Sequence, residues 1–340
     1  MNTVLLTGGS GFIGGHLSRV LAERGLNVRC LVRSTSDRGT LEKQGASLVV
    51  GDLSDRESLT RAIKGVDVVV HAAGVMKSLT HQEMMCVNSE GTSNLVSVCA
   101  KRTSPPVFVL VSSIAAAGVA IPGRPLREKD DCKPVSKYGL SKRAGEIAAA
   151  AFADRLPVTV VRPPIVFGGG DRHGFHLFQP IWRFGIHPVP GMRHRRQVSL
   201  IHAADLAEGI VLAAERGSRV IKDDAAREHF QQGCYFVSDP QPVRYSQLGT
   251  LIGRAMGRRR IIKLPSPDLV VVTLGGVNSC LARLSGRACV FSFDKAREGT
   301  AGNWICSPER IQQELGFAPK ASLEDRLQET VDWYRTNNWF

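Results

Sequence analysis

The sequence predicts an α/β protein in which helices cover both faces of a doubly wound parallel sheet, beside a smaller and less regular lobe. Three observations predict this fold: short apolar runs recur along the first half of the 340 residues, segments with helical spacing separate them, and glycines follow the first run. Strands that are apolar throughout are buried on both faces, as in a parallel sheet between two helix layers. A hydrophobic content of 43% is ample for such a core.

The elements are expected in regular alternation up to about residue 166. Residues 2–6 form the first expected strand, glycines close it, and residues 12–24 follow with helical spacing. Strands that alternate with helices are typical of βαβ units. The other expected strands lie at 27–32, 47–50, 66–73, 106–113 and 158–163, and further helical patterns cover 55–65, 83–102 and 202–216.

The glycine-rich turn TGGSGFIGG (7–15) follows the first strand and opens the first helix. Gly8, Gly11 and Gly14 have the spacing G-x-x-G-x-x-G. Missing Cβ atoms permit a tight turn and a close approach of a pyrophosphate, and the helix N-terminus offers free N–H groups. A purely structural turn is the alternative. The strand–turn–helix context favours a Rossmann-type dinucleotide site.

Two domains are expected, because the regular pattern ends near residue 166. The following loops are rich in Gly, Pro and His, and the segment 240–320 mixes short helices and turns. We expect an NAD(P)-binding Rossmann domain over 1–166, with contributions from about 196–238. Residues 167–195 and 239–340 mainly form the expected substrate-binding lobe.

The residue after the second strand indicates which dinucleotide is preferred. NAD-binding folds place an acid near this point to hold the ribose 2′-OH. Here Val32 and Arg33 occupy it, followed by Ser34 and, further on, Arg38. A guanidinium pairs with a 2′-phosphate, which an acid would repel. We expect NADP(H) to be favoured over NAD(H), the alternative being that Arg33 is a surface residue or stacks on the adenine.

The formal net charge of +13 could serve nucleic acid, an anionic membrane surface or an anionic ligand. The densest basic clusters are short, at 193–196 and 258–260, and aromatic residues are only 6%. No recognisable nucleic-acid module appears. We therefore expect a small-molecule substrate and no nucleic-acid partner.

The eight cysteines are scattered, without a Cys-x-x-Cys pair or zinc-like Cys/His spacing, so we expect no metal. Free thiols without a secretory leader predict a cytoplasmic protein. The apolar segment 269–284 is short and interrupted by Gly, Asn and Arg, which argues against stable membrane insertion. We expect an amphipathic helix over the core; a lid over an apolar pocket or a helix that touches lipid is the alternative.

Tyr138 and Lys142 stand four positions apart, so on a helix they share one face. Such a pair alone is typical of an exposed helix edge. Hydride transfer to a ketone, however, needs a proton for the developing alkoxide, and a nearby ammonium lowers the pKa of a phenol. The pair therefore predicts a proton-transfer site downstream of the glycine turn.

The sequence resembles the extended short-chain dehydrogenase/reductase family of NAD(P)-dependent epimerases, dehydratases and ketone reductases, over nearly the whole chain. Its C-terminal segments resemble those of one branch of this family, the 3β-hydroxysteroid dehydrogenases and dihydroflavonol reductases. The resemblance rests on TGGSGFIG (7–14), GDLSD (51–55), HAAG (71–74), VNSEGTSNL (87–95), VSSIAAAG (111–118), YGLSK (138–142), RPPIVFG (162–168) and LIHAADLAEG (200–209).

This resemblance implies a role for each matching residue. Tyr138 and Lys142 match the catalytic pair, Ser113 the catalytic serine that orients the substrate oxygen, and Asn88 the residue that supports the lysine. Asp52 and Leu53 are implied at the adenine. The other implied cofactor-binding residues are Phe12, Ile13, Ala72, Ala73, Gly74 and Pro163.

The resemblance implies an oxidoreductase that interconverts a secondary alcohol and a ketone, on an apolar or steroid/polyketide-like molecule. One alternative is a nucleotide-sugar epimerase or dehydratase with tightly bound NAD. Val198-Ser199 replaces the Arg-Asp that binds the diphosphate in many such enzymes, although Arg193, Arg195 or Arg196 could substitute. Another alternative is a cofactor-sensing protein without turnover. A homodimer is expected from the resemblance alone.

Overall fold

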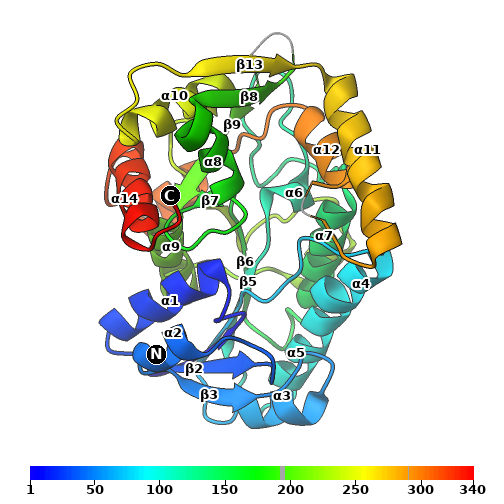
Figure 1. Ribbon diagram of the computed structural model, residues 1–340. Coiled ribbons are helices and arrows are strands. Elements are labelled where there is room, and N and C mark those ends of the chain that lie inside the picture. Colours follow the sequence, from blue (N-terminus) through cyan, green and yellow to red (C-terminus); the bar gives the residue numbers. More distant parts are fainter. Residues whose placement is uncertain (192–195, 290) are drawn as a thin grey trace.

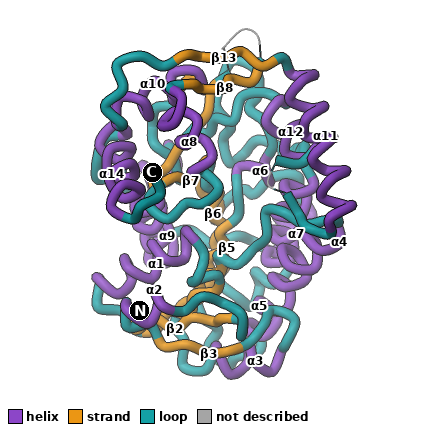
Figure 2. Tube along the Cα trace, in the orientation of Figure 1, coloured by secondary structure: helices purple, strands orange, loops and turns teal. Residues whose placement is uncertain are grey.

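The computed structural model describes residues 1–191, 196–289 and 291–340. A large parallel sheet with its helices occupies the lower part of Figure 1, and a second lobe made mostly of helices and loops lies above it (Figures 1 and 2). Both termini are visible on the same side of the molecule, the N-terminus in the sheet part and the C-terminus in the second lobe (Figure 1).

Within the described ranges, seven strands form one sheet in the order β11–β6–β5–β4–β1–β2–β3, and all neighbours are parallel. The strand order reverses between β1 and β4. The predicted doubly wound parallel sheet is confirmed. The bounds are β1 Thr3–Thr7, β2 Asn27–Val32, β3 Ser47–Val50, β4 Val68–His71, β5 Val107–Val111, β6 Val158–Arg162 and β11 Cys234–Phe236.

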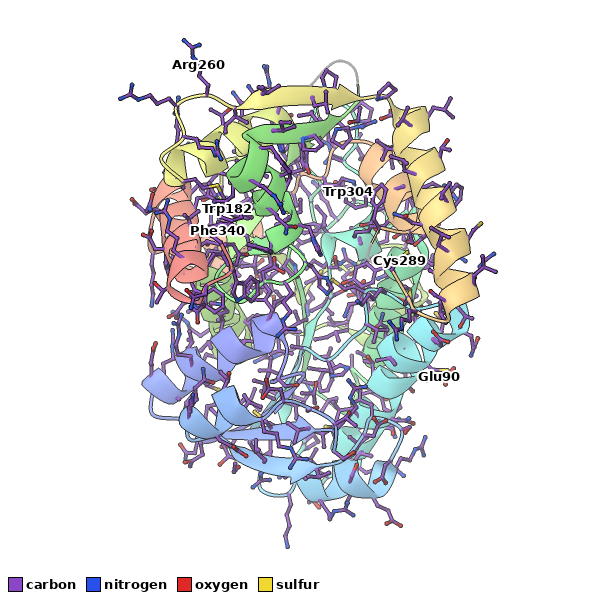
Figure 3. The ribbon with its side chains drawn as sticks, viewed as in Figure 1. Glu90, Trp182, Arg260, Cys289, Trp304 and Phe340 are labelled. Atoms are coloured by element: carbon purple, nitrogen blue, oxygen red, sulfur yellow. The ribbon has the colours of Figure 1, made fainter. Side chains whose placement is uncertain are left out.

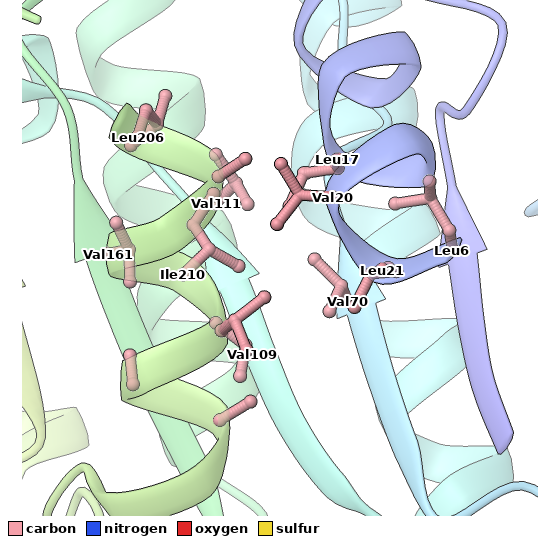
Figure 4. Close-up of a cluster of buried hydrophobic side chains, with 14 of the residues drawn as sticks. Leu6, Leu17, Val20, Leu21, Val70, Val109, Val111, Val161, Leu206 and Ile210 are labelled. Atoms are coloured by element: carbon pink, nitrogen blue, oxygen red, sulfur yellow. The ribbon is translucent and has the colours of Figure 1, made fainter. Parts of the chain in front are cut away.

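One face of the sheet is covered by α1 (Phe12–Glu23) and α9 (Ala203–Arg216), with α13 (Glu309–Leu315) against α9. Leu17, Val20 and Leu21 recur at helical spacing along α1 and are buried. Figure 4 shows Leu17 and Val20 directed toward the strands and toward Ile210 of α9. Burial of this apolar stripe fixes the first helix after the glycine turn.

The other face is covered by α3 (Arg56–Ala62), α5 (Gly91–Ala100) and α7 (Lys137–Ala150), whose apolar residues form a second cluster with the strands. The helix predicted over 83–102 is present from His81 to Ala100, and a π-helical turn η1 (Cys86–Glu90) joins α4 (His81–Met85) to α5 within it. Short helices elsewhere are α2 (Gly39–Lys43), α6 (Ile114–Ala117) and the 3₁₀ helix η2 (Lys222–Ala226).

The second lobe contains short strand pairs and longer helices around its own core, which includes Phe178, Trp304 and Tyr334. Its described strands pair as β7 (Ile165–Phe167) with β10 (Leu200–His202), β8 (Ile186–Pro190) with β13 (Ile262–Ser266), and β9 (Gln197–Val198) with β12 (Val243–Arg244). Its helices are α8 (Phe175–Phe184), α10 (Tyr245–Ala255), α11 (Asp268–Ser285), α12 (Phe293–Thr300) and α14 (Leu323–Thr336).

Helix α11 differs from the expectation of an amphipathic helix lying over the core. Only Gly275 and Ala282 of its 18 residues are buried. Its closely packed side faces α12, and most of its aliphatic side chains face outward. Among the described residues it is the one helix long and apolar enough to cross a membrane, which by itself is weak evidence for doing so.

A buried ion pair joins α7 to the sheet. Arg162 at the end of β6 donates to both carboxylate oxygens of Glu146 on α7, at 2.8 and 2.7 Å, and both side chains are fully buried. Arg143 adds a third bond to this carboxylate at 3.1 Å. Burial alone would raise the pKa of Glu146, but the two arginines and the Ser112 hydroxyl hold it below its usual value. The carboxylate is therefore charged.

We predict that Glu146→Leu lowers the free energy of unfolding by about 3–5 kcal/mol, because it leaves Arg162 buried without its partner. The double variant Glu146→Leu/Arg162→Met is expected to recover a large part of this loss, since no unpaired charge remains at Arg162. Urea denaturation of the three proteins measures both effects. A single variant as stable as the wild type would contradict this account.

Candidate active site

The carboxyl ends of the parallel strands gather the predicted cofactor residues at one edge of the sheet. The glycine turn follows β1, Arg33 follows β2, Asp52 lies just past β3 and Gly74 just past β4. Ser113 and Pro163 lie just past β5 and β6. Ligands of open α/β sheets bind beyond this edge where the strand order reverses, here between β1 and β4.

The glycine turn leaves an open cradle at the start of α1. Gly8 has a φ of +74°, and a Cβ there would lie 2.6 Å from the backbone nitrogen of Ala73. A Cβ at Gly14 would lie 2.1 Å from the carbonyl oxygen of Gly8. Gly11 precedes α1, which begins at Phe12 and Ile13, and no side chain caps the helix start. The free N–H groups and the missing side chains fit the pyrophosphate of a dinucleotide.

Arg33 and Asp52 lie at neighbouring strand ends, where the second and third strands leave the sheet. The Arg33 side chain is exposed and makes no hydrogen bond within the described part of the chain, whereas Arg38 donates to the carbonyl of Ser34 at 3.3 Å. Two hydrogen bonds from Ser54, together with the charge of Arg33, lower the pKa of Asp52. Leu53 follows, partly buried, with its carbonyl bound by Asn94.

The segment after β4 brings residues predicted to bind the cofactor close to residues predicted to be catalytic. Ala72 and Ala73 are held by Thr7 at the end of β1, through its carbonyl and its hydroxyl. A Cβ at Gly74 would lie 3.0 Å from Oδ1 of Asn88 and 3.6 Å from Nζ of Lys142. Glycine at this position therefore leaves the space over Lys142 open.

Asn88 supports the region around Lys142 through three side-chain hydrogen bonds. It lies in the π-helical turn η1, is buried, and bonds both the N–H and the carbonyl of Val75 at 2.9 Å. Its amide nitrogen also donates to Ser141, the residue before Lys142, at 2.9 Å. Nζ of Lys142 donates to the carbonyl oxygen of Val111 at 2.8 Å. A π-helical turn is often found at a functional site, where it re-aims one side chain.

The two serines after β5 are engaged differently. Ser112 is buried and donates to Glu146 at 2.6 Å, so it belongs to the structural ion pair. Ser113 caps α6 by accepting from the N–H of Ala115 at 3.1 Å, and its hydroxyl also hydrogen-bonds Tyr138. This difference agrees with the choice of Ser113 rather than Ser112 as the serine of the site.

The phenol of Tyr138 is neutral at pH 7 in this structure. Burial and, to a smaller extent, the charge of Glu298 raise its pKa to about 12, against the opposing effect of the hydrogen bond with Ser113. The expectation that Lys142 lowers this pKa is not met, because the ammonium is directed at Val111. Burial lowers the pKa of Lys142 itself to about 8, against a raising effect of Glu146.

Helix α12 contributes two charged groups that the sequence did not predict. Nζ of Lys295 lies 5.6 Å from the centre of the Tyr138 ring and pairs with Glu298. Glu298 is buried, and its Oε2 atom has no hydrogen-bond partner among the described residues. Trp304, labelled in Figure 3, fixes the helix by donating to the carbonyl of Glu298 at 3.0 Å. The segment 240–320 carries no motif that would have indicated this contact.

A cavity of about 230 Å³ opens beside Tyr138. Its walls come from the loop 76–80, the start of α7, the C-terminal half of α11 and the start of α12. Cys289, labelled in Figure 3 near the lower part of α11, also lines it. The described residues contain no group of three or more His, Cys, Asp or Glu that could hold a metal ion.

A buried hydrogen-bond chain links the glycine turn to Asn88, and it was also missed by sequence reasoning. His71 is fully buried at the end of β4 and bonds Thr7 at 2.6 Å and Thr92 at 3.0 Å. Thr92 in turn donates to the carbonyl of Asn88 at 2.8 Å. Burial, with a smaller effect of Lys142, lowers the pKa of His71 to about 3, so the imidazole is neutral.

We predict that acid destabilises the fold in part through His71. The unfolded chain binds a proton at this histidine below pH ~6.5, whereas the folded chain does so only near pH 3, so stability falls as the pH drops through this window. The slope from one such group is about 1.4 kcal/mol per pH unit. Urea denaturation between pH 7 and pH 4 is expected to show a shallower slope for His71→Gln. His229→Gln, at a half-exposed histidine, is the control, and an unchanged slope for His71→Gln would refute the assignment.

Comparison with known proteins agrees with this geometry. The model of the NAD dependent epimerase/dehydratase family matches residues 4–225. The chain is 33% identical to the ceramide reductase of Caulobacter vibrioides (strain NA1000 / CB15N), over 99% of this chain and 95% of that protein. It is 31% identical to a 4-hydroxy-2-methyl-3-oxo-4-farnesyl-3,4-dihydroquinoline-1-oxide ketoreductase of Stigmatella aurantiaca, over 74% of this chain and 72% of that protein.

The fold is also that of solved nucleotide-sugar enzymes. The structure of UDP-glucose 4-epimerase from Thermotoga maritima, with UDP-glucose, superimposes with a TM-score of 0.77 and covers 99% of both chains. The sequences are 21% identical, so this likeness concerns the fold alone.

Proposed function

Because the chain belongs to the NAD dependent epimerase/dehydratase family and is an oxidoreductase of the extended short-chain dehydrogenase/reductase type, we propose that it interconverts a secondary alcohol and a ketone on an apolar, lipid-like molecule. The observation that carries the proposal is the neutral Tyr138 phenol, hydrogen-bonded to Ser113 beside a cavity that α11 lines with Ser279, Ala282 and Arg283. The relatives named as a ceramide reductase and a farnesyl-quinoline ketoreductase favour a substrate of this class.

The cofactor expected here is a nicotinamide dinucleotide, held by the glycine cradle, by Asp52 and by the segment 72–74. When bound, it supplies the hydride that reduces the ketone carbon. We propose NADP(H) over NAD(H), supported by the free guanidinium of Arg33 and by Val32 where an acid would bind the ribose 2′-OH.

The side chains of the site manage the proton and the orientation of the substrate oxygen. The Ser113 hydroxyl donates to the ketone oxygen and fixes its position. Tyr138 gives its phenolic proton to the oxygen as negative charge develops there, and takes it back in the reverse direction. A phenol with a raised pKa holds that proton at neutral pH, which suits ketone reduction. Asn88 keeps Ser141 and the adjoining Lys142 in place.

A nucleotide-sugar epimerase or dehydratase is the second candidate, supported by the family and by the shared fold. The arginines proposed to bind a diphosphate do not strengthen it. Arg196 makes a two-bond ion pair with Asp268, at 2.8 and 2.6 Å, so it is already engaged. Arg193 and Arg195 lie outside the described residues. The third candidate, a cofactor sensor, is disfavoured by the proximity of Ser113 to Tyr138.

Further expectations remain proposals. The eight cysteines all lie in the described ranges as free thiols, which supports a cytoplasmic location.

The division into a Rossmann domain and a substrate-binding lobe is proposed with the bounds 1–166 plus about 196–238, and 167–195 plus 239–340. The position of β11 in the large sheet supports the contribution proposed for about 196–238. Helix α13, which lies beyond this range, also packs on α9. The homodimer rests on resemblance to the family.

We predict that Tyr138→Phe lowers the rate of ketone reduction by about 10²–10⁴-fold, because the proton donor is lost. Cofactor binding, measured by fluorescence titration, is expected to change little. The control is Tyr245→Phe, at a partly buried tyrosine stacked on His187 in the second lobe, and this variant is expected to keep its activity. Tyr138→Phe with undiminished turnover would overturn the assignment.

We predict that Arg33→Asp reverses the cofactor preference. Loss of a charge-assisted bond is expected to weaken NADP binding by about ten- to a hundredfold, while NAD binding is retained or improved. Arg61→Asp, an exposed residue on α3, makes the same charge change away from the site. Dissociation constants of both cofactors with each protein measure the effect, and a wild type that binds NAD more tightly would contradict the NADP proposal.

A further inference from the structure

Helix α11 exposes a wide apolar face that nothing in the described structure covers. Most of its aliphatic side chains are more than half exposed, and those at its two ends, Leu269 and Leu284, are 78% and 85% exposed. Isolated exposed leucines are ordinary, but a contiguous group of this kind marks an interaction surface. The group, called the α11 face below, consists of Leu269, Val270, Leu274, Val277, Leu281 and Leu284.

The shape of the α11 face favours a lipid surface over a second helix. At about 100° per residue, its side chains span an arc of roughly 140°. The seam of a coiled coil is a narrower stripe. Asp268 and Arg283 are the only charged residues of the helix, and both lie off this arc. Thr273 is the one polar residue within this arc, and so apolar an arc is typical of helices that lie in a membrane interface.

Strand β13 extends the apolar surface at the start of α11. Ile262 and Leu264 are two residues apart on this strand, so their side chains point to the same side, and they are 64% and 51% exposed. Figure 1 shows β13 running along the top of the molecule directly into α11. The exposed strand and helix together form one edge of the second lobe.

Basic residues surround this surface. Between residues 258 and 288 the sequence has six Lys or Arg and a single acid, Asp268, which is paired with Arg196. Arg259, Arg260 and Lys263 are exposed at the β13 end, and Figure 3 shows Arg260 directed away from the protein. Arg283 and Arg287 are exposed at the other end of α11. This charge complements an anionic bilayer, which attracts Lys and Arg near an apolar anchor.

The inner side of α11 is packed against the protein, so the helix lies on the second lobe rather than leaving it. A Cβ at Gly275 would lie 2.6 Å from the Cβ of Ala296 on α12. The hydroxyl of Ser279 accepts from the N–H of Phe293 at 2.8 Å. These contacts hold α11 along the surface of the second lobe, so the helix would lie parallel to a bilayer that touches this lobe and would not cross it.

The apolar surface leads to the candidate active site. The cavity beside Tyr138 shares Ala282, Ala288 and Cys289 with a shallow hollow on the outside of α11. Leu281 and Leu284 line that hollow. The hollow beside the α11 face and the cavity that contains the phenol therefore adjoin each other at these three shared residues.

We propose that the α11 face and β13 dock the protein onto the surface of an anionic lipid bilayer, from which a lipid substrate enters the cavity. The proposed docking surface is inferred from the exposed aliphatic side chains and the basic residues around them alone. Only the entry of substrate rests on the proposed function.

The test is sedimentation of the purified full chain with vesicles of phosphatidylcholine alone or with phosphatidylglycerol. We expect binding to the phosphatidylglycerol vesicles, weakened by added salt. Leu274→Gln/Leu281→Gln, at two exposed positions where Gln keeps helix propensity, is expected to reduce binding about tenfold. Val50→Gln, an equally exposed aliphatic on the edge strand of the sheet, is expected to leave it unchanged. Circular dichroism confirms that each variant is folded.

Three results overturn the proposal. One is a wild type that does not sediment with either vesicle, and another is a double variant that sediments as well as the wild type. The third is a wild-type dimer, seen by light scattering, that the double variant converts to a monomer while vesicle binding is lacking, because a second copy then covers the α11 face. Vesicle binding without any ketone reduction would support the docking and refute the proposed function instead.

Discussion

The close approach of β1 and β4 at the point where the strand order reverses is the constraint on which the rest of the site depends. A side chain at Gly8 would collide with the backbone of Ala73, and one at Gly14 with the carbonyl of Gly8. Because both positions lack a Cβ, the first helix starts close enough to the fourth strand to form a phosphate cradle. Thr7 then holds Ala72 and Ala73 in place, and His71 ties Thr7 to the π-helical turn that carries Asn88. The close approach of β1 and β4 therefore positions both the proposed cofactor cradle and the residues that support the helix carrying Tyr138.

One neutral histidine and one buried ion pair keep this arrangement rigid. His71 is neutral in the protein interior, so it can join two threonine hydroxyls without burying a charge. Glu146 and Arg162 are both charged and pair fully inside the protein, tying α7 to β6. Tyr138 and Lys142 lie on that same helix. The proposed proton donor is thus held by a helix that cannot move away from β6 without leaving a buried charge unpaired.

Much of the fold and of the site could be predicted from the sequence, because the signals are local. The apolar runs predict the parallel strands, and Gly8, Gly11 and Gly14 predict the turn after the first of them. Other features depend on contacts between distant segments. Glu298 reaches Tyr138 from a helix near the end of the chain, and no spacing in the sequence relates the two. Hydropathy alone predicted α11 as an amphipathic helix, but only its packing on α12 shows that the apolar side faces outward. The pKa of Tyr138 also depends on burial, which a Tyr–Lys spacing does not report.

We propose that Tyr138 and a bound dinucleotide together reduce a ketone on a lipid-like molecule. Incubation of the chain with a reduced cofactor deuterated at the transferring carbon, and with long-chain lipid ketones, measures it directly by mass spectrometry of the product. We expect an alcohol that carries one deuterium on the former carbonyl carbon, with one cofactor oxidised for each molecule formed. Unchanged ketone, together with epimerisation of a sugar nucleotide and no net oxidation of cofactor, would contradict it.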